Sequence, residues 1–310
     1  MLRIAVPDLV SNSYFPAIAA VELGFFKSEG YDASIDLLFP IPKTFEALRD
    51  GQLDFVVGSA HATLLAFPQW QGAKLLAAVG QHTYWFLVIR SDLKPTHGDL
   101  TIVKGLRIGA APGVNLSLQR MLVEAGIDPE KNNVQIMPIP GAAGPNVSFG
   151  LSAARALEEG KLDGFWANGM GCEVAVRRGV GTMVLDVRRG DGPPAARDYT
   201  FSALVATEKR IKDEPESARA AIRALMKAHK ALKENVRRAT EVGNKRFPPS
   251  EAALIAELVR RDLPYYDPQI SQEKVTSMNR FARDIGLLSA EVSYEQVVAT
   301  QFSHLWMESV

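Results

Sequence analysis

Two segments of the chain repeat the same order of hydrophobic and polar residues. Residues 47–55 and 156–164 both read as the end of an amphipathic helix, a glycine, the pair Leu-Asp and the start of an apolar strand. A second shared pattern, Leu-Arg-Ile followed by small apolar residues and proline, precedes the two copies at residues 2–7 and 106–112. Because a repeated pattern usually means a repeated structural unit, the chain is predicted to form two lobes of one design, with a ligand between them.

Short apolar runs alternate with segments of helical periodicity through the first lobe. This alternation favours a parallel sheet with helices on both faces. A β-favouring run at 85–90 follows, before a polar loop that extends to Gly98. The predicted strands are 2–7, 33–37, 54–58 and 74–80, and the predicted helices are 14–24, 43–50 and 60–67.

The second half of the chain repeats the alternation and then becomes helical. Strands are predicted at 106–111, 133–139, 163–167 and 181–186, and helices at 116–125, 147–159 and 170–178. An exposed turn-rich loop at 188–194 leads to another β run at 201–206. Helices are predicted at 214–240, 250–262, 271–285 and 293–308, and this tail is expected to pack on lobe one.

The predicted fold class is therefore α/β. It has two lobes, each with a doubly wound sheet, two crossing strands near 84–92 and 199–207, and a helical C-terminal tail. Lobe one is expected to comprise residues 1–90 and 200–310, and lobe two residues 91–199. A length of 310 residues also favours two cores over one.

Composition excludes several classes of function. The formal net charge is zero, which argues against nucleic acid as a partner. The single cysteine and five histidines show no ligand spacing, so neither a metal site nor a cofactor is expected. No phosphate-binding glycine loop or G-x-S-x-G elbow is present, and no apolar run approaches the roughly 20 residues of a membrane span. No export signal is visible, so the expected location is the periplasm if such a signal was removed, and otherwise the cytoplasm.

The motifs Gly-Phe-Phe-Lys-Ser-Glu-Gly at 24–30 and Gly-x-Leu-Asp-Phe-x-x-Gly at 51–58 carry a family resemblance. In this order they resemble the substrate-binding proteins of ABC importers for nitrate, sulfonates, taurine and pyrimidine precursors of thiamine. The resemblance implies a type 2 periplasmic-binding-protein fold that closes on a small ligand, with an ABC permease as partner. A pyrimidine synthase and an aryl sulfinate desulfinase share this fold, so an enzyme stays open as an alternative.

Ligands of open α/β sheets bind at the carboxyl ends of the strands, where loops and helix N-termini converge. Ser59 and Ser117 also suit helix caps, and Tyr84, Trp85 and Trp166 offer flat faces for stacking. The glycine- and proline-rich loop 140–146 is either a cover for the ligand or an ordinary connection. The candidate ligand-binding residues are Asn12, Ser13, Tyr14, Gly58, Ser59, Ala60, His61, Tyr84, Trp85, Gly113, Asn115, Ser117, Trp166, Asn168 and Gly169.

Two functional hypotheses follow. The first is a solute-binding protein that captures a small polar or anionic organic molecule by hinge closure between the lobes. The second is an enzyme on the same scaffold, in which His61 acts with Cys172 or a hydroxyl in desulfination, decarboxylation or ring chemistry. Cys172 lies early in a predicted helix, where the helix dipole lowers a thiol pKa, although a buried structural cysteine is the alternative.

Overall fold

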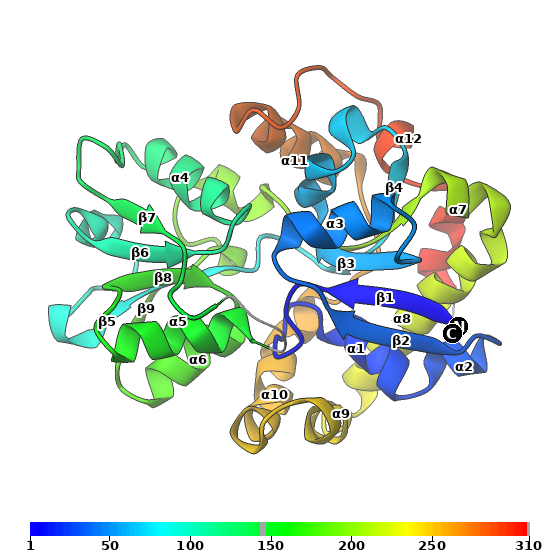
Figure 1. Cartoon of the computed structure of the whole chain (residues 1–310), viewed down its shortest axis with the longest axis horizontal. Coiled ribbons are helices and arrows are strands. Elements are labelled where there is room, and N and C mark those ends of the chain that lie inside the picture. Colours follow the sequence, from blue (N-terminus) through cyan, green and yellow to red (C-terminus); the bar gives the residue numbers. More distant parts are fainter. Residues whose placement is uncertain (143–146, 309–310) are drawn as a thin grey trace. The chain divides into compact units, whose positions relative to one another are not determined.

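The computed structural model describes residues 1–142 and 147–308, which form two compact units (Figure 1). Unit 1 consists of Met1–His82 and Thr200–Val310, and unit 2 of Thr83–Tyr199. In sequence, unit 2 is thus inserted into unit 1. The expected boundary at residue 90 differs from the observed one by a whole strand, because residues 86–90 hydrogen-bond within the sheet of unit 2.

Unit 1 is built on a five-stranded sheet with the order β2-β1-β3-β10-β4. Its strands are β1 (Leu2–Val6), β2 (Ala33–Leu37), β3 (Phe55–Ser59), β4 (Ala73–Gly80) and β10 (Ser202–Thr207). Strand β1 runs parallel to β2 and β3, whereas β10 runs antiparallel to β3 and β4. Every residue of β3 is buried, as a short apolar run in a central strand requires.

Unit 2 has a second five-stranded sheet, with the order β7-β6-β8-β5-β9. Its strands are β5 (Phe86–Arg90), β6 (Arg107–Ala110), β7 (Gln135–Met137), β8 (Gly164–Ala167) and β9 (Gly181–Asp186). Strand β6 runs parallel to β7 and β8, and β5 runs antiparallel to β8 and β9. The two sheets therefore match strand for strand, with β5 in the place that β10 occupies in unit 1.

The sheets are mixed rather than wholly parallel, because the strands predicted as crossings near 84–92 and 199–207 each join a sheet in antiparallel orientation. The register gives the reason. Strand β10 begins with Ser202 opposite Ser59, the last residue of β3, and β5 begins with Phe86 opposite Ala167, the last residue of β8. In each unit the chain enters the sheet at the carboxyl ends of the parallel strands, so the entering strand must run antiparallel to them.

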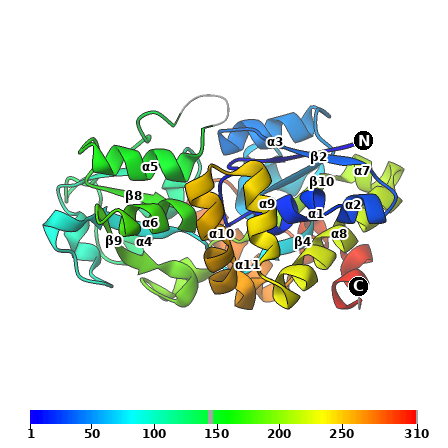
Figure 2. The same cartoon turned by 90° about the horizontal axis from the view of Figure 1, so that it is seen from below.

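Helices cover the sheet of unit 1, and the C-terminal tail supplies several of them. In this unit α1 packs against α8, and α8 also packs against β4, while α9 and α10 lie side by side (Figures 1 and 2). Short 3₁₀ turns occupy Ala60–Leu65, Pro68–Trp70, Leu263–Tyr265 and Thr300–Met307. The helices of unit 1 are α1 (Phe15–Glu22), α2 (Phe25–Ser28), α3 (Ile41–Arg49), α7 (Glu208–Asp213), α8 (Pro215–Glu234), α9 (Arg238–Arg246), α10 (Pro249–Asp262), α11 (Gln272–Asp284) and α12 (Tyr294–Val297).

Two predicted tail helices are shorter than expected. The helix predicted over 214–240 ends at Asn235, whose extended backbone separates α8 from α9. The helix predicted over 293–308 stops after α12, because Val298 forms a β-bridge with Leu75 and Ala299 donates to the Leu75 carbonyl. Pairing with the edge strand β4 thus places Val298 in an extended conformation, and the chain continues as the 3₁₀ turn Thr300–Met307.

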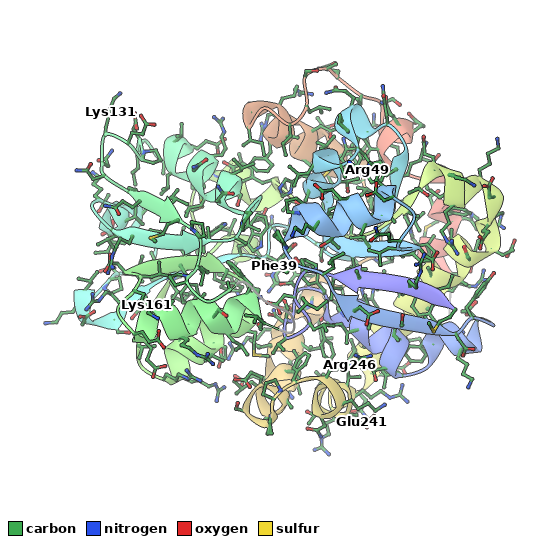
Figure 3. All side chains as sticks on the ribbon, viewed as in Figure 1. Phe39, Arg49, Lys131, Lys161, Glu241 and Arg246 are labelled. Atoms are coloured by element: carbon green, nitrogen blue, oxygen red, sulfur yellow. The ribbon has the colours of Figure 1, made fainter. Side chains whose placement is uncertain are left out.

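Unit 2 has three α-helices in its described part, α4 (Asn115–Glu124), α5 (Phe149–Glu158) and α6 (Gly169–Arg177). Helices α5 and α6 meet at two glycines, where a β-carbon on Gly171 would lie 2.6 Å from the Gly150 carbonyl oxygen. Charged side chains such as Lys131 and Lys161 project from the surface of this unit (Figure 3). Of the helices that the structure describes in either unit, none is both long and apolar enough to cross a membrane.

The repeated sequence motif forms the same contacts at the amino ends of both sheets. In unit 1 the backbone N–H of Arg3 donates to Asp54 over 2.6 Å, and its guanidinium donates to the Gly51 carbonyl over 2.9 Å. In unit 2 the N–H of Arg107 donates to Asp163 over 3.0 Å, and its guanidinium donates to the Gly160 carbonyl over 3.0 Å. We call these two sets of residues the Arg–Asp clamps.

A second arginine completes each clamp from the antiparallel strand or the helix that follows it. Arg210, in α7 after β10, donates to Asp54 over 2.7 Å, and Arg90, at the end of β5, donates to Asp163 over 3.4 Å. The guanidinium of Arg107 also contacts both carboxylate oxygens of Asp163 and lowers the pKa of that carboxyl to about 2. The repeated motif that marks the two lobes in the sequence therefore has a structural role at the starts of the strands.

Candidate ligand-binding site

The candidate residues of unit 1 lie where two neighbouring strands end. Strands β1 and β3 pair side by side, with Ile4 opposite Phe55, so their carboxyl ends share one edge of the sheet. The loop after β1 contains Asn12, Ser13 and Tyr14, and the 3₁₀ turn after β3 begins with Ala60 and His61. All the candidate side chains of this unit are buried.

Asn12 has one polar atom in use and one without a partner. Its amide nitrogen donates to Asp262 at the end of α10 over 2.8 Å, across 250 positions of sequence. Its carbonyl oxygen has no hydrogen-bond partner among the described residues, and neither has the hydroxyl of Ser13, although both atoms are buried. A buried polar atom without a partner costs about 1–3 kcal/mol, which a ligand or a water molecule offsets.

His61 contacts Thr200, which lies just before β10, and Phe281 of α11. Its Nδ1 lies 2.9 Å from the hydroxyl of Thr200, and its ring packs edge to face on Phe281 with centroids 5.3 Å apart. The expected helix over 60–67 is a 3₁₀ turn, Ala60–Leu65, and the side chain of Ser59 does not cap it. The capping interpretation of Ser59 is therefore wrong.

The polar candidate residues of unit 2 form hydrogen bonds within unit 2. Ser117 donates to the Val114 carbonyl over 2.6 Å and accepts from the indole N–H of Trp166 over 3.0 Å. Asn168 caps α6 by accepting from the Gly171 N–H over 3.1 Å. Asn115 accepts from the N–H of Gly113 over 3.0 Å. These bonds shape the strand-end loops.

Three predicted aromatic residues come together in unit 2. The rings of Trp85 and Trp166 have centroids 6.1 Å apart, and those of Tyr84 and Trp85 are 5.2 Å apart. Phe86, the first residue of β5, pairs with Ala167 at the end of β8, which places this cluster at the carboxyl end of β8. The sheet pairing thus joins residues that are about eighty positions apart in sequence.

Arg188 is a candidate that sequence reasoning missed. It follows β9 in the 3₁₀ turn Val187–Arg189, so it stands at the same sheet edge as the ends of β6 and β8. It is only 5% exposed, and it is the one lysine or arginine that is buried in the described part of the chain. The loop was predicted to be exposed because two arginines precede glycines and prolines. Arg189 is indeed 56% exposed and pairs with Asp186 over 3.1 Å.

Two buried carboxylates of unit 1, Asp8 and Asp262, were also missed. Asp8 lies in the loop after β1 and accepts from the Val10 N–H over 3.0 Å. Asp262 is in the tail, and no local pattern in the sequence associates it with Asn12. Only the packing of the tail on unit 1 identifies it.

The proposed pairing of His61 with Cys172 stays a prediction. Cys172 is a buried thiol in α6 of unit 2, and its backbone N–H donates to the Asn168 carbonyl. His61 belongs to unit 1. In the loop predicted at 140–146, residues 143–146 lie outside the described residues. Among the described side chains no cluster of three or more His, Cys, Asp or Glu is arranged to hold a metal ion.

Two cavities lie away from the strand ends of unit 1. One, of about 470 Å³, adjoins the clamp of Asp54 and Arg210. The other, of about 370 Å³, lies beside α8 and is lined by His229, Tyr266 and Trp306. Neither is lined by a predicted site residue. Burial lowers the pKa of His229 to about 4, although Nε2 lies 2.9 Å from the Val79 carbonyl.

Comparison with known proteins connects this geometry to a family. The protein-family model described as "NMT1/THI5 like" matches residues 11–239 of the chain. No curated protein matches the chain.

Solved structures match nearly the whole chain. A putative periplasmic sulfonate-binding protein SsuA from Methylobacillus flagellatus has 18% identity and a TM-score of 0.67, over 99% of this chain and 95% of that one. The periplasmic nitrate-binding protein NrtA from Synechocystis PCC 6803 has 15% identity and a TM-score of 0.75, over 98% and 86%. The enzyme DszB in complex with biphenyl-2-sulfinic acid has 14% identity and a TM-score of 0.67, over 98% of both chains. At identities this low, the matches show a shared fold and no more. These structural matches confirm the predicted two-lobed periplasmic-binding-protein fold.

Proposed function

Because the chain belongs to the NMT1/THI5-like family and has the periplasmic-binding-protein fold, we propose that it is a solute-binding protein of an ABC importer. Its ligand is a small polar organic molecule, bound at the carboxyl ends of the strands. The observation that carries this proposal is a pair of buried polar atoms that have no partner in the described part of the chain, the Asn12 carbonyl oxygen and the Ser13 hydroxyl. A strand-end loop that holds such atoms away from water is suited to binding a ligand.

Each unit offers a different kind of contact. Unit 1 supplies hydrogen-bonding groups of the loop after β1. Unit 2 supplies the buried guanidinium of Arg188, which suits an anionic group of the ligand, and the aromatic cluster of Tyr84, Trp85 and Trp166. In each unit these residues stand at the sheet edge where the chain passes to the other unit.

The partner and the location follow from the same proposal. SsuA and NrtA are described as periplasmic binding proteins, and SsuA as part of a sulfonate ABC transporter. We infer that this chain delivers its ligand to an ABC permease and works outside the cytoplasmic membrane. Hinge closure on the ligand stays a prediction, which small-angle scattering with and without ligand tests.

The direct test of binding is a thermal-shift panel followed by calorimetry on the intact chain. Small carboxylates, sulfonates, amines and amino-heterocycles form the panel. A true ligand at a hundred times its Kd stabilises the folded state by about 2.7 kcal/mol. Ser13→Ala should weaken binding several-fold, whereas Ser34→Ala, at a half-buried serine of β2, should leave it unchanged. A panel without a single stabilising compound would contradict the proposal.

A further inference from the structure

The cavity of about 370 Å³ beside α8 in unit 1 shares no lining residue with the candidate ligand-binding site. Met226, His229 and Tyr266 form its buried walls, and the half-buried Pro268 and Trp306 complete them. Pockets for small molecules have about this size, mainly apolar and aromatic walls, and a few polar groups that fix the orientation of the ligand. The polar group on the wall therefore determines which compound such a cavity accepts.

His229 supplies a hydrogen-bond acceptor to this wall. A backbone carbonyl only accepts hydrogen bonds, so Nε2, which lies 2.9 Å from the Val79 carbonyl oxygen, carries the ring hydrogen. Burial lowers the pKa of His229 to about 4, so at neutral pH the ring is uncharged and Nδ1 holds a lone pair. Nδ1 has no hydrogen-bond partner among the described residues, although the side chain is only 4% exposed. An acceptor buried in this way favours a donor from outside the chain.

Packing fixes the direction in which the imidazole offers this acceptor. Helix α8, which carries His229, packs against β4, which carries Val79 (Figure 2). The ring of Tyr266 stacks on one face of the imidazole, with centroids 5.1 Å apart and planes inclined by 14°. Since Nε2 is turned to β4 and one face is covered, Nδ1 is the polar edge that the side chain has left for the cavity that it lines.

The remaining polar groups give the cavity no preference for a charged ligand. Trp306 donates its indole N–H to the Leu76 carbonyl over 3.0 Å, so it offers ring surface to the cavity. The exposed lining residues carry two positive and two negative charges, and they are Lys230, Lys233, Glu234 and Glu308. An oxyanion would also have no donor to offer to Nδ1. An uncharged compound with one O–H or N–H group fits these conditions.

We propose that this cavity is a second small-molecule site, which takes an uncharged aromatic compound whose hydroxyl or ring N–H donates to Nδ1 of His229. Phenols and indole-like heterocycles form this chemical class. The same ring system without the O–H or N–H leaves Nδ1 unpaired in the occupied cavity. The inference goes beyond the proposed solute-binding function and does not depend on it.

The wall of the cavity is hydrogen-bonded to the end of β4. The Ala78 N–H donates to the Pro268 carbonyl, and the Gln81 N–H donates to the Tyr265 carbonyl, both over 2.9 Å. A compound that packs against this wall should slow the opening of these bonds. Hydrogen exchange of residues 78–81 should therefore become slower when the cavity is occupied, which locates the bound compound independently of its affinity.

Pairs of compounds that have nearly the same shape and differ in the donor test the inference by calorimetry on the intact chain. The pairs are phenol with toluene and indole with indene. In a cavity that is only apolar, the hydrocarbon would bind more tightly because it is the more hydrophobic member. We expect the opposite order, with phenol and indole favoured by about fivefold or more, since the hydrocarbon leaves a buried acceptor unpaired.

The variant His229→Phe tests the role of the imidazole. It keeps a planar ring in the wall and removes both nitrogens, so the order within each pair should change in favour of the hydrocarbon. The matched control is His304→Phe, because His304 is exposed and does not line the cavity, and this variant should keep the wild-type order. Because His229→Phe also loses the contact with Val79, the nitrogen-15 resonance of Nδ1 in the wild type gives a second readout. It should move on addition of phenol and move much less with toluene.

Each outcome decides the inference. A preference for phenol and indole that is lost in His229→Phe and kept in His304→Phe supports it. Equal affinities within the pairs, or tighter binding of the hydrocarbons to the wild type, would overturn the role of Nδ1. If none of the four compounds binds at millimolar concentration, the cavity is not such a site. The solute-binding proposal stands or falls separately, because the two sites share no residue.

Discussion

The two units share a sheet and differ at one edge of it. Their strand orders correspond one to one, and at the amino ends both use an Arg–Asp clamp with closely similar distances. At the carboxyl ends unit 1 buries two carboxylates, and the Asn12 carbonyl oxygen and the Ser13 hydroxyl have no hydrogen-bond partner among the residues that the structure describes. Unit 2 buries an arginine, the carboxylate of Asp186 and an aromatic cluster there, and its candidate amides and hydroxyl are used in local hydrogen bonds.

This difference separates structural from functional residues. The clamps, which both units have, belong to the structural framework. We place ligand recognition at the carboxyl ends of the strands, where the charged and hydrogen-bonding groups of the two units differ.

The largest effect is expected from breaking the close contact between α5 and α6 at Gly150 and Gly171 of unit 2. Gly171→Ala places a β-carbon 2.6 Å from the Gly150 carbonyl and should cost roughly 3–4 kcal/mol of folding free energy. The 3₁₀ turn after β3 in unit 1 has no such crossing. Urea denaturation measures the loss. In the control Val176→Ala, at an exposed position of α6, the folding free energy should change by less than about 1 kcal/mol. Equal losses in the two variants would refute the role of the helix crossing.

The units should also differ in their response to acid. His229 in unit 1 has a folded pKa of about 4, below its ordinary 6.5, because burial disfavours the charged ring. The unfolded chain therefore takes up this proton first, and stability falls by about 3 kcal/mol between pH 6.5 and 4. In unit 2 the contribution of Asp163, whose pKa is lowered from 3.8 to about 2, is present above pH 3.8 and is lost only below it.

Hydrogen exchange of each unit, measured as a function of pH, distinguishes the pH range in which His229 lowers stability from the range in which Asp163 does. In His229→Gln the loss between pH 6.5 and 4 should largely disappear, while unit 2 keeps its own response below pH 3.8. An unchanged acid response in this variant would show that His229 does not govern it.

Binding should depend on Arg188 and not on its neighbour. Arg188→Gln removes the buried guanidinium and should weaken an anionic ligand by roughly 10–100-fold, equivalent to about 1.5–3 kcal/mol. Arg189→Gln is the control, since that side chain is exposed and pairs with Asp186. Calorimetry with a ligand from the panel measures both variants. If they lose affinity equally, the distinction between the two arginines is mistaken.

The smallest effect is expected at Cys172. As a binding protein the chain should keep its affinity within about twofold in Cys172→Ser, because the thiol behaves as a small buried group. Ligand recovered after prolonged incubation should be chemically unchanged, as mass spectrometry detects. Product formation by the wild type that stops in Cys172→Ser would instead favour the enzyme hypothesis.

Most of the fold could be predicted because its determinants are local. The Gly-x-Leu-Asp part of each clamp recurs with the same internal spacing, and the alternation of apolar runs with helical periodicity marks most of the strands and helices. The antiparallel insertion of β5 and β10 was missed, since pairing of Phe86 with Ala167 or of Ser202 with Ser59 leaves no local trace in the sequence.

The candidate site could be predicted only in part. Strand ends identified Asn12, Ser13 and Trp166 as candidates. The sequence could not show that Asn12 contacts Asp262, which lies 250 positions away. Nor could it show that Arg188 turns inward while Arg189 stays exposed, because the side-chain directions in that turn depend on tertiary packing.

Hydrogen–deuterium exchange with and without the tightest ligand of the panel tests the central claim most directly. We predict that the ligand protects the strand-end segments of both units, residues 10–15 and 59–63 in unit 1 and residues 166–170 and 187–189 in unit 2. The clamp segments, residues 51–54 and 160–163, should exchange as before. Protection confined to the clamp segments, or to one unit alone, would contradict the claim that the dissimilar strand ends of both units bind the ligand.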